Sequence, residues 1–224
     1  MSIADRKARE KERRRTDILN AAEKHFFSKG YDNVSFEDIA QEVELNRATI
    51  YLYFKNKESL YLAIVLRAVR QLLSVTKERL ANCGDSYHKI DAMGYSYLYY
   101  ARVYPDYFKA YREFQTGRFD AVGAIDAAED FAEIASAQKE YFNLWFDTFA
   151  SGKFAGAIKS NVDPQFAAVL MMSAIENVAE MRPALMGALE ARGVNSHAFV
   201  WADFRSFIYD LIGHPEKSQA FKPF

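Results

Sequence analysis

The chain has 224 residues, half of them apolar and about a quarter charged, so it can bury a core and remain soluble. Its longest apolar runs are far shorter than a membrane helix, and no apolar segment follows the charged N-terminus. The single cysteine, Cys83, excludes an internal disulfide, and four widely spaced histidines give no metal-ligand spacing. We therefore expect a cytoplasmic protein with no membrane partner, no metal and no cofactor.

Charge is distributed unevenly around the small net value of −1. Residues 6–15 read RKAREKERRR, with seven basic and two acidic side chains, so this basic arm carries a charge of +5. Such an arm indicates that one end of the chain meets nucleic-acid phosphate. The alternative is a solvated helix face on which Glu10 and Glu12 pair with their basic neighbours.

Helical signals dominate the chain, and no alternating apolar pattern indicates a sheet, so we expect an all-α fold. The first helix is predicted to begin in the basic arm and to end at Gly30, where a left-handed cap is favourable. The second helix is predicted to begin after Ser35, with Asp38 completing a capping box. The apolar side of the first helix repeats every four residues, at Ile18, Ala22 and Phe26.

A third short helix follows the turn at residues 44–45, with Asn46 as its cap and an expected end near Phe54. Two short helices joined by a tight turn are typical of a helix-turn-helix. An arginine there can donate to guanine, a small alanine allows close approach to base edges, and hydroxyls can bond phosphate. The candidate DNA-binding residues are Ser35, Arg47, Ala48, Thr49, Tyr51, Tyr53 and Lys57.

Some of these candidates also have a purely structural interpretation. Tyr51 is expected to pack partly against the domain, Ser35 to serve mainly as a cap, and Lys57 to be a first-turn surface lysine. Arg47 adds nothing to an apolar core, so its functional interpretation is the strongest.

Longer helices are predicted after residue 56, and they bring the total to about nine. We assign residues 1–60 to a DNA-binding domain, residues 61–213 to a helical ligand-binding and dimerisation domain, and residues 214–224 to a tail. The predicted later helices cover 57–81, 86–103, 105–116, a long segment from beyond Gly123 to about 150 closed by Gly152, 164–191, and 196–212.

Residues 15–64 resemble the DNA-binding domain of the TetR family of regulators. The matching positions are Arg15, Ile18, Ala21-Ala22, Phe26, Gly30-Tyr31, Asp38-Ile39-Ala40, Thr49-Ile50-Tyr51, Tyr53-Phe54, Lys57-Glu58 and Leu60. The family usually has glycine at the position of Glu44 and often at that of Ala48. The resemblance implies an all-helical homodimer that binds operator DNA, usually as a repressor released by a small molecule. It covers residues 65–224 only in the general helix plan.

Aromatic residues are dense in 87–114 and again in the helix that ends near 150. They indicate either a solid aromatic core or a pocket for an apolar or aromatic effector. The candidate pocket residues are Tyr97, Tyr100, Tyr104, Tyr107, Tyr111, Phe142, Trp145 and Phe146.

The last two predicted helices carry apolar stripes that would pair across a two-fold axis as a four-helix bundle. The alternative is that these stripes pack only inside one protomer. The candidate dimer-interface residues are Val178, Met181, Trp201, Phe204 and Ile208.

Other functions are less consistent with this sequence. It contains no catalytic Ser/His/Asp set, phosphate-binding loop or H-E-x-x-H motif, so we expect no enzyme, although a helical enzyme without a motif is one alternative. A membrane-surface role for the basic arm would need an apolar helix face that the arm lacks. We expect three partners: operator DNA, a second copy of the chain and an unknown small-molecule effector. A ligand-independent regulator, with the aromatic region only as core, remains open, as does repressor versus activator.

Overall fold

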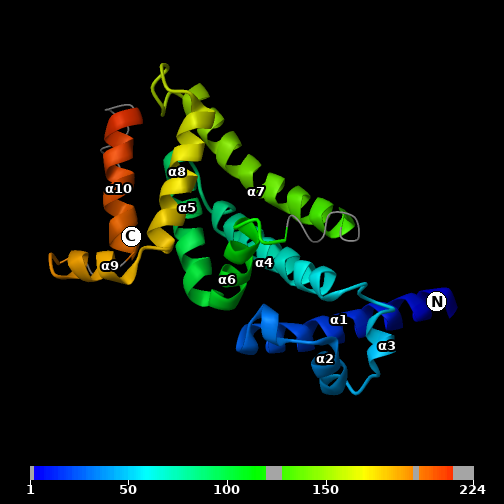
Figure 1. The fold of residues 1–224 in the computed structure, drawn as a ribbon. Coiled ribbons are helices and arrows are strands. Elements are labelled where there is room, and N and C mark those ends of the chain that lie inside the picture. Colours follow the sequence, from blue (N-terminus) through cyan, green and yellow to red (C-terminus); the bar gives the residue numbers. More distant parts are fainter. Residues whose placement is uncertain (1–2, 120–127, 194–196, 214–224) are drawn as a thin grey trace. The chain divides into compact units, whose positions relative to one another are not determined.

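The computed structural model describes residues 3–119, 128–193 and 197–213, which form ten α-helices and one 3₁₀ helix and contain no β-strand (Figure 1). The predicted all-α fold is confirmed, and the predicted tail, 214–224, lies outside the described residues. The elements are α1 (Ile3–Lys29), η1 (Tyr31–Asn33), α2 (Phe36–Glu42), α3 (Arg47–Ile50), α4 (Lys57–Leu80), α5 (Ser86–Val103), α6 (Pro105–Gln115), α7 (Ala128–Phe154), α8 (Pro164–Ala179), α9 (Pro183–Glu190) and α10 (His197–Ile212).

Three predicted helix ends were wrong. The segment 164–191 is not one helix, because Pro183 lacks a backbone N–H and opens a separate helix, α9. The helix α7 continues through Gly152 and ends at Phe154. The third helix stops at Ile50, and residues 51–53 continue as a turn.

The chain folds into two compact units, which we describe separately. Unit 1 comprises Met1–Arg70 and Asp106–Ala137, and unit 2 comprises Gln71–Pro105 and Gln138–Phe224. Unit 1 therefore includes α6 and the start of α7, which the sequence-based division assigned to the second domain. The boundary after residue 60 stays a prediction.

The core of unit 1 is built on the four-residue repeat of α1. Ile18, Ala22 and Phe26 are 0%, 0% and 3% exposed, and they lie opposite buried residues of α2, α3 and α4 such as Ile39, Ile50 and Leu60. The predicted end of this helix is confirmed, since α1 ends at Lys29, and Gly30 has φ 78° and ψ 160°, a positive-φ backbone that favours glycine but is not the left-handed helical cap that was predicted. This core orients the helix-turn-helix.

The core of unit 2 joins α5, α8 and α10. Gly94 of α5 allows close packing, because a Cβ built there would lie 2.1 Å from the ring of Trp201. Four residues after Trp201 in α10, Arg205 Nη1 lies 3.0 Å from Asp91 Oδ1 of α5, and both side chains are buried. Burial raises the pKa of Asp91 to about 6, although the Arg205 charge opposes that shift. The two helices are thus held by shape and by charge.

By length and composition alone, α4 could cross a membrane, the one such helix in the part of the chain that the structure describes. Most of its apolar stretch is buried inside the protein, as expected of a core helix.

Candidate nucleic-acid interface

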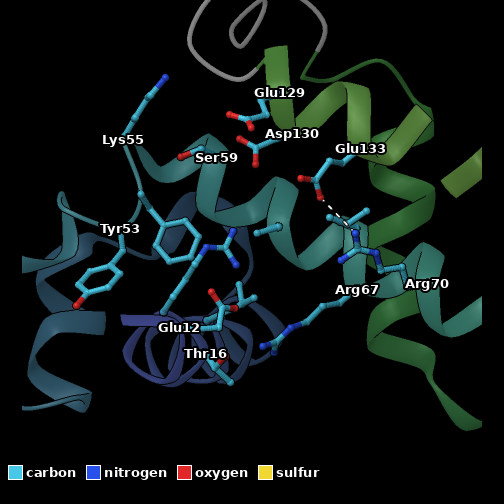
Figure 2. A pocket seen from close by; sticks show the side chains of 15 residues that line it. Glu12, Thr16, Tyr53, Lys55, Ser59, Arg67, Arg70, Glu129, Asp130 and Glu133 are labelled. Atoms are coloured by element: carbon cyan, nitrogen blue, oxygen red, sulfur yellow. Dashed lines mark hydrogen bonds and ion pairs between the residues drawn. The ribbon is translucent and has the colours of Figure 1, made fainter. Parts of the chain in front are cut away.

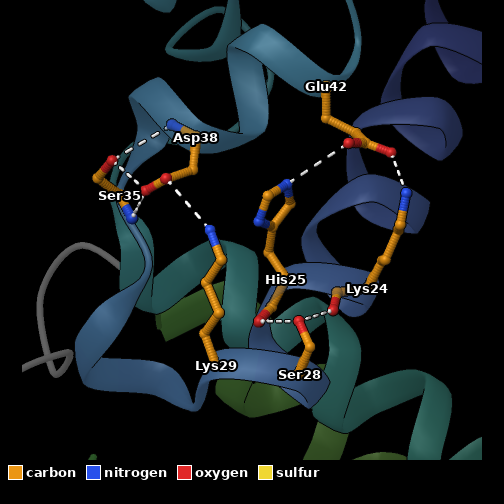
Figure 3. Close-up of polar contacts among 7 residues, drawn as sticks. All are labelled: Lys24, His25, Ser28, Lys29, Ser35, Asp38 and Glu42. Atoms are coloured by element: carbon orange, nitrogen blue, oxygen red, sulfur yellow. Dashed lines mark hydrogen bonds and ion pairs between the residues drawn. The ribbon is translucent and has the colours of Figure 1, made fainter.

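The predicted capping box at the start of α2 is confirmed (Figure 3). The backbone N–H of Asp38 donates to Ser35 Oγ at 3.3 Å, and the backbone N–H of Ser35 donates to Asp38 Oδ2 at 2.8 Å. The Ser35 hydroxyl donates to the same carboxylate at 2.6 Å. These bonds and the nearby Lys29 lower the pKa of Asp38 to about 2. Because the Ser35 hydroxyl already donates its proton to Asp38, it would have to break that hydrogen bond in order to donate to a phosphate.

Ion pairs tie α2 to the end of α1, as Figure 3 also shows. Lys24 Nζ lies 2.5 Å from Glu42 Oε1, and Lys29 Nζ lies 3.4 Å from Asp38 Oδ1. Lys24 lowers the pKa of Glu42 by donating to its carboxylate. Both ends of α2 are therefore attached to α1, which limits how far the helix-turn-helix can move on its own.

The turn between α2 and α3 has a strained residue. Glu44 adopts φ 54°, the left-handed region that residues with a Cβ rarely occupy. Its backbone N–H still donates to Gln41 O at 3.3 Å, and that of Leu45 donates to Ala40 O at 2.9 Å. The turn thus has a backbone that suits glycine, and the chain adopts it with a glutamate.

Within the recognition segment, residues 46–53, the predicted DNA-binding residues Arg47, Ala48 and Tyr51 are exposed, whereas Thr49 and Tyr53 are half-buried. Asn46 caps α3 by accepting from the Thr49 backbone N–H at 2.8 Å and from Thr49 Oγ1 at 2.9 Å. Arg47 and Ala48 are exposed, while Ile50 is completely buried. Arg47 Nη2 donates to the hydroxyl of Tyr51 at 2.9 Å, so this arginine is positioned by its own helix rather than by the core.

Two tyrosines flank an apolar residue that sequence reasoning missed. The ring of Tyr51 packs edge-on against Phe36, with centroids 4.9 Å apart, so its predicted partial packing is confirmed. Tyr53 is half-buried. Between them, Leu52 is 75% exposed, four residues after Ala48, in the turn that follows α3. Exposed apolar side chains such as these can contact a thymine methyl group, and an apolar residue four positions after Ala48 was the available signal.

Lys57 has a structural role. Its Nζ donates to Tyr31 O at 3.0 Å and to Val34 O at 3.1 Å, and it lies 4.4 Å from the centre of the Tyr31 ring. The ammonium group thus holds η1 and the residue before the α2 cap. By contrast, Lys55 is exposed two residues earlier, in the turn that leads from α3 to α4.

A cleft of about 690 Å³ opens beside this turn within unit 1 (Figure 2). Its walls come from α1, from residues 53–55, from α4 and from the first turns of α7. Figure 2 shows Glu129, Asp130 and Glu133 together on the α7 side, with Glu133 Oε2 3.3 Å from Arg70 Nη2. Burial, followed by repulsion from the two glutamates, raises the pKa of Asp130 against the pull of Arg15 and Lys55. The cleft therefore holds charges of both signs next to the recognition segment.

Two predicted pocket residues belong to unit 1. The hydroxyl of Tyr107 donates to Glu23 Oε1 of α1 at 3.0 Å, and Arg67 Nη1 of α4 lies 2.9 Å from the same oxygen. Burial and the Glu23 carboxylate raise the pKa of Tyr107 to about 12. Tyr111 is buried, at 2% exposure. The Glu23 carboxylate thus connects three helices of unit 1.

The other predicted pocket residues belong to unit 2. Tyr97, Tyr100 and Trp145 are at most 1% exposed. Within the described ranges, the buried indole N–H of Trp145 has no hydrogen-bond acceptor. The remaining three, Tyr104, Phe142 and Phe146, are half-buried.

The predicted dimer-interface residues face mostly inward. Trp201, Ile208 and Val178 are buried inside unit 2, at 0%, 3% and 6% exposure. Phe204 and Met181 are half-buried. Among the side chains of α8 and α10 that the structure describes, the large apolar ones that are exposed are Phe166 (68%), Val169 (48%), Leu170 (37%) and Phe207 (64%).

An all-helical chain with a capped, arginine-bearing recognition segment belongs to the class of helix-turn-helix DNA-binding proteins. Residues 18–64 match the family described as bacterial regulatory proteins, tetR family. Residues 18–64 are therefore similar to the DNA-binding part of TetR-family transcriptional regulators.

Known proteins resemble the chain to different extents. The transcriptional activator FasR of Mycolicibacterium smegmatis is 29% identical over 82 residues, which are 37% of each chain. The negative regulator IcaR of the Staphylococcus aureus biofilm operon icaADBC is 32% identical over 82 residues, 37% of this chain and 42% of IcaR. The matches thus span less than half of these relatives. A TetR/AcrR family regulator from Thermobifida fusca has the same fold, with a TM-score of 0.64 at 24% identity over 86% of this chain and 94% of that one.

Proposed function

We propose that the protein is a homodimeric regulator that binds specific DNA sequences. Substitution of Arg47 tests this function most directly. The exposed guanidinium, at the first position of a capped α3, is the observation that carries the proposal. Arg47 reads a guanine, Ala48 and Leu52 contact apolar base edges, and Tyr51, Tyr53 and Lys55 contact phosphates. Ser35 and Thr49 support this surface, and Lys57 acts by holding η1.

Selection of bound duplexes from a random pool tests this function. The expected product is a near-palindrome, since a two-fold dimer requires a two-fold operator with recognition helices about 34–36 Å apart, or a multiple of that. Recovery of no common motif, with the protein folded and dimeric, would contradict the proposal.

The dimer uses the exposed apolar face of α8 and α10 rather than the buried stripe of α10. Phe166, Val169, Leu170 and Phe207 form this face, and helices that pack together in one protomer can pair with the same helices of a second copy. Sedimentation at the concentrations used for operator binding measures the oligomeric state, and a monomer there would contradict this assignment.

The regulator is a repressor, and a small apolar or aromatic molecule releases it by lowering its affinity for the operator. The support is the aromatic interior of unit 2, where the buried indole N–H of Trp145 has no acceptor among the described residues. An effector must prefer the shape that does not fit DNA, and a coupling of about 1–3 kcal/mol weakens binding roughly 5- to 150-fold. A ligand found by thermal-shift screening should bind less tightly by the same factor when operator is present. Equal affinity with and without operator would leave the aromatic region as core.

A further inference from the structure

The N-terminal half of α1 is a rigid, basic extension of the DNA-binding unit. It belongs to the same continuous helix as the buried repeat that begins at Ile18, so the basic arm is not a loose tail. From Ile3 to Arg14 the helix extends for about 18 Å at 1.5 Å per residue, a length that matches about five base pairs of duplex.

The basic residues of this arm form two neighbouring rows along the helix. Lys7, Lys11 and Arg14 follow one another at i, i+4 and i+7, and a second row of arginines lies beside them at 6, 9 and 13. All six side chains are exposed. Glu10 pairs with Arg13 and Arg14, at 3.1 Å from each, but it offsets only one of these charges.

The base of the arm adjoins the recognition segment. Glu12 and Arg15 line the same cleft as Tyr53 and Lys55, so this part of α1 lies next to the turn that follows α3 (Figure 2). The second acidic residue of the arm, Glu12, lines this cleft, and the basic side chains at 6, 7, 9, 11, 13 and 14 are exposed. Duplex that extends past the bases read by the recognition segment would therefore lie near the basic arm.

We propose that residues 6–14 of α1 form a second DNA-binding surface, which contacts the phosphate backbone of duplex flanking the bases read by α3. The inference rests on the proposed function. The phosphate backbone presents a regular array of negative charge whatever the base sequence. An exposed basic helix with no apolar face is suited to bind such an array. The arm therefore adds affinity and salt sensitivity but no base preference.

The test compares two charge variants on two duplexes. The arm variant carries Arg6→Gln, Lys7→Gln and Lys11→Gln, which keep good helix formers in place. The control changes three exposed basic residues elsewhere by the same total charge, as Arg102→Gln, Lys109→Gln and Lys139→Gln. Each protein is titrated at several salt concentrations with the selected operator core alone and with the same core extended by about ten flanking base pairs on each side, about one turn of duplex.

For each protein on the long duplex, the logarithm of affinity is plotted against the logarithm of salt concentration. Each lost phosphate contact should reduce the steepness of this slope by about 0.9, so the slope of the arm variant should be smaller by up to about 2.7 per protomer. Raising salt from about 50 to 200 mM would then weaken the wild type roughly 40-fold more than the variant. The control should behave as wild type, and both variants should match wild type on the core.

Three results would overturn the inference. One is an arm variant, helical by circular dichroism, with the wild-type salt dependence on the long duplex. Another is an arm variant that binds with altered base preference. The third is tighter binding of the wild type to vesicles rich in phosphatidylserine than to duplex. Sequence-specific binding by the wild type together with any of these would leave the proposed function intact, whereas no duplex binding by the wild type would overturn both.

Discussion

Arg47→Ala should remove one base contact and leave the fold unchanged. The side chain is exposed, and its guanidinium is held by the hydroxyl of Tyr51 at 2.9 Å, so its loss opens no cavity around Ile50. Exposed substitutions of this kind change stability by about 0.5 kcal/mol or less. A lost bidentate contact to guanine costs about 1–3 kcal/mol per half-site, or roughly 5- to 150-fold in affinity. The motif selected from a random pool should therefore blur at one position in each half-site.

Tyr51→Phe is the matched comparison for that variant. Wild-type Arg47 must exchange its bond to Tyr51 for one to guanine, and a typical intramolecular hydrogen bond contributes about 0.5–1.5 kcal/mol net. Freed from this bond, Arg47 should keep its guanine preference, with affinity within about tenfold of wild type. Competition titrations with matched and mismatched duplexes measure both effects. The reasoning is refuted if Arg47→Ala selects the wild-type motif while its thermal unfolding is unchanged.

Neutralising the acidic start of α7 with Glu129→Gln and Asp130→Asn should raise operator affinity a few-fold, because exposed charge pairs contribute about 0.2–1 kcal/mol each. Unchanged affinity in salt titrations would show that these carboxylates do not compete with phosphate. Glu44→Gly should relieve about 1 kcal/mol of left-handed strain and raise the unfolding midpoint by about 2–4 °C, whereas Glu44→Ala should not. Phe207→Glu should dissociate the dimer in sedimentation, while Phe154→Glu, at a side chain 98% exposed on α7, should not. Equal unfolding midpoints for Glu44→Gly and Glu44→Ala would contradict the strain assigned to Glu44. Equal oligomeric states for Phe207→Glu and Phe154→Glu would contradict the assigned dimer face.

Local rules allowed the helix-turn-helix to be predicted in detail. The capping box at Ser35, the Asn46 cap and the helix end at Gly30 each depend on residues within four positions, so the sequence contains the full cause. The break before Pro183 was equally local, and the predicted helix over 164–191 overlooked it.

Contacts between distant residues could not be predicted in this way. Lys57 donates to carbonyls 23 and 26 residues earlier, which no helix-start pattern specifies. The stripe containing Trp201 was correctly apolar, but periodicity gives the direction of a face and not the surface that covers it. Gly94 on α5 covers it, over a hundred residues away in the chain.

Both α4 and α7 pass from one unit to the other without a break, at residues 70–71 and 137–138. Hybrid proteins that join unit 1 of this chain to another helical unit would therefore have to keep the helical phase at both joins. One added residue turns all that follows by 100° and advances it by 1.5 Å, whereas seven bring the helix back to within about 20° of its original direction. Insertion length, rather than the composition of the inserted residues, would therefore set the direction in which each helix leaves the join.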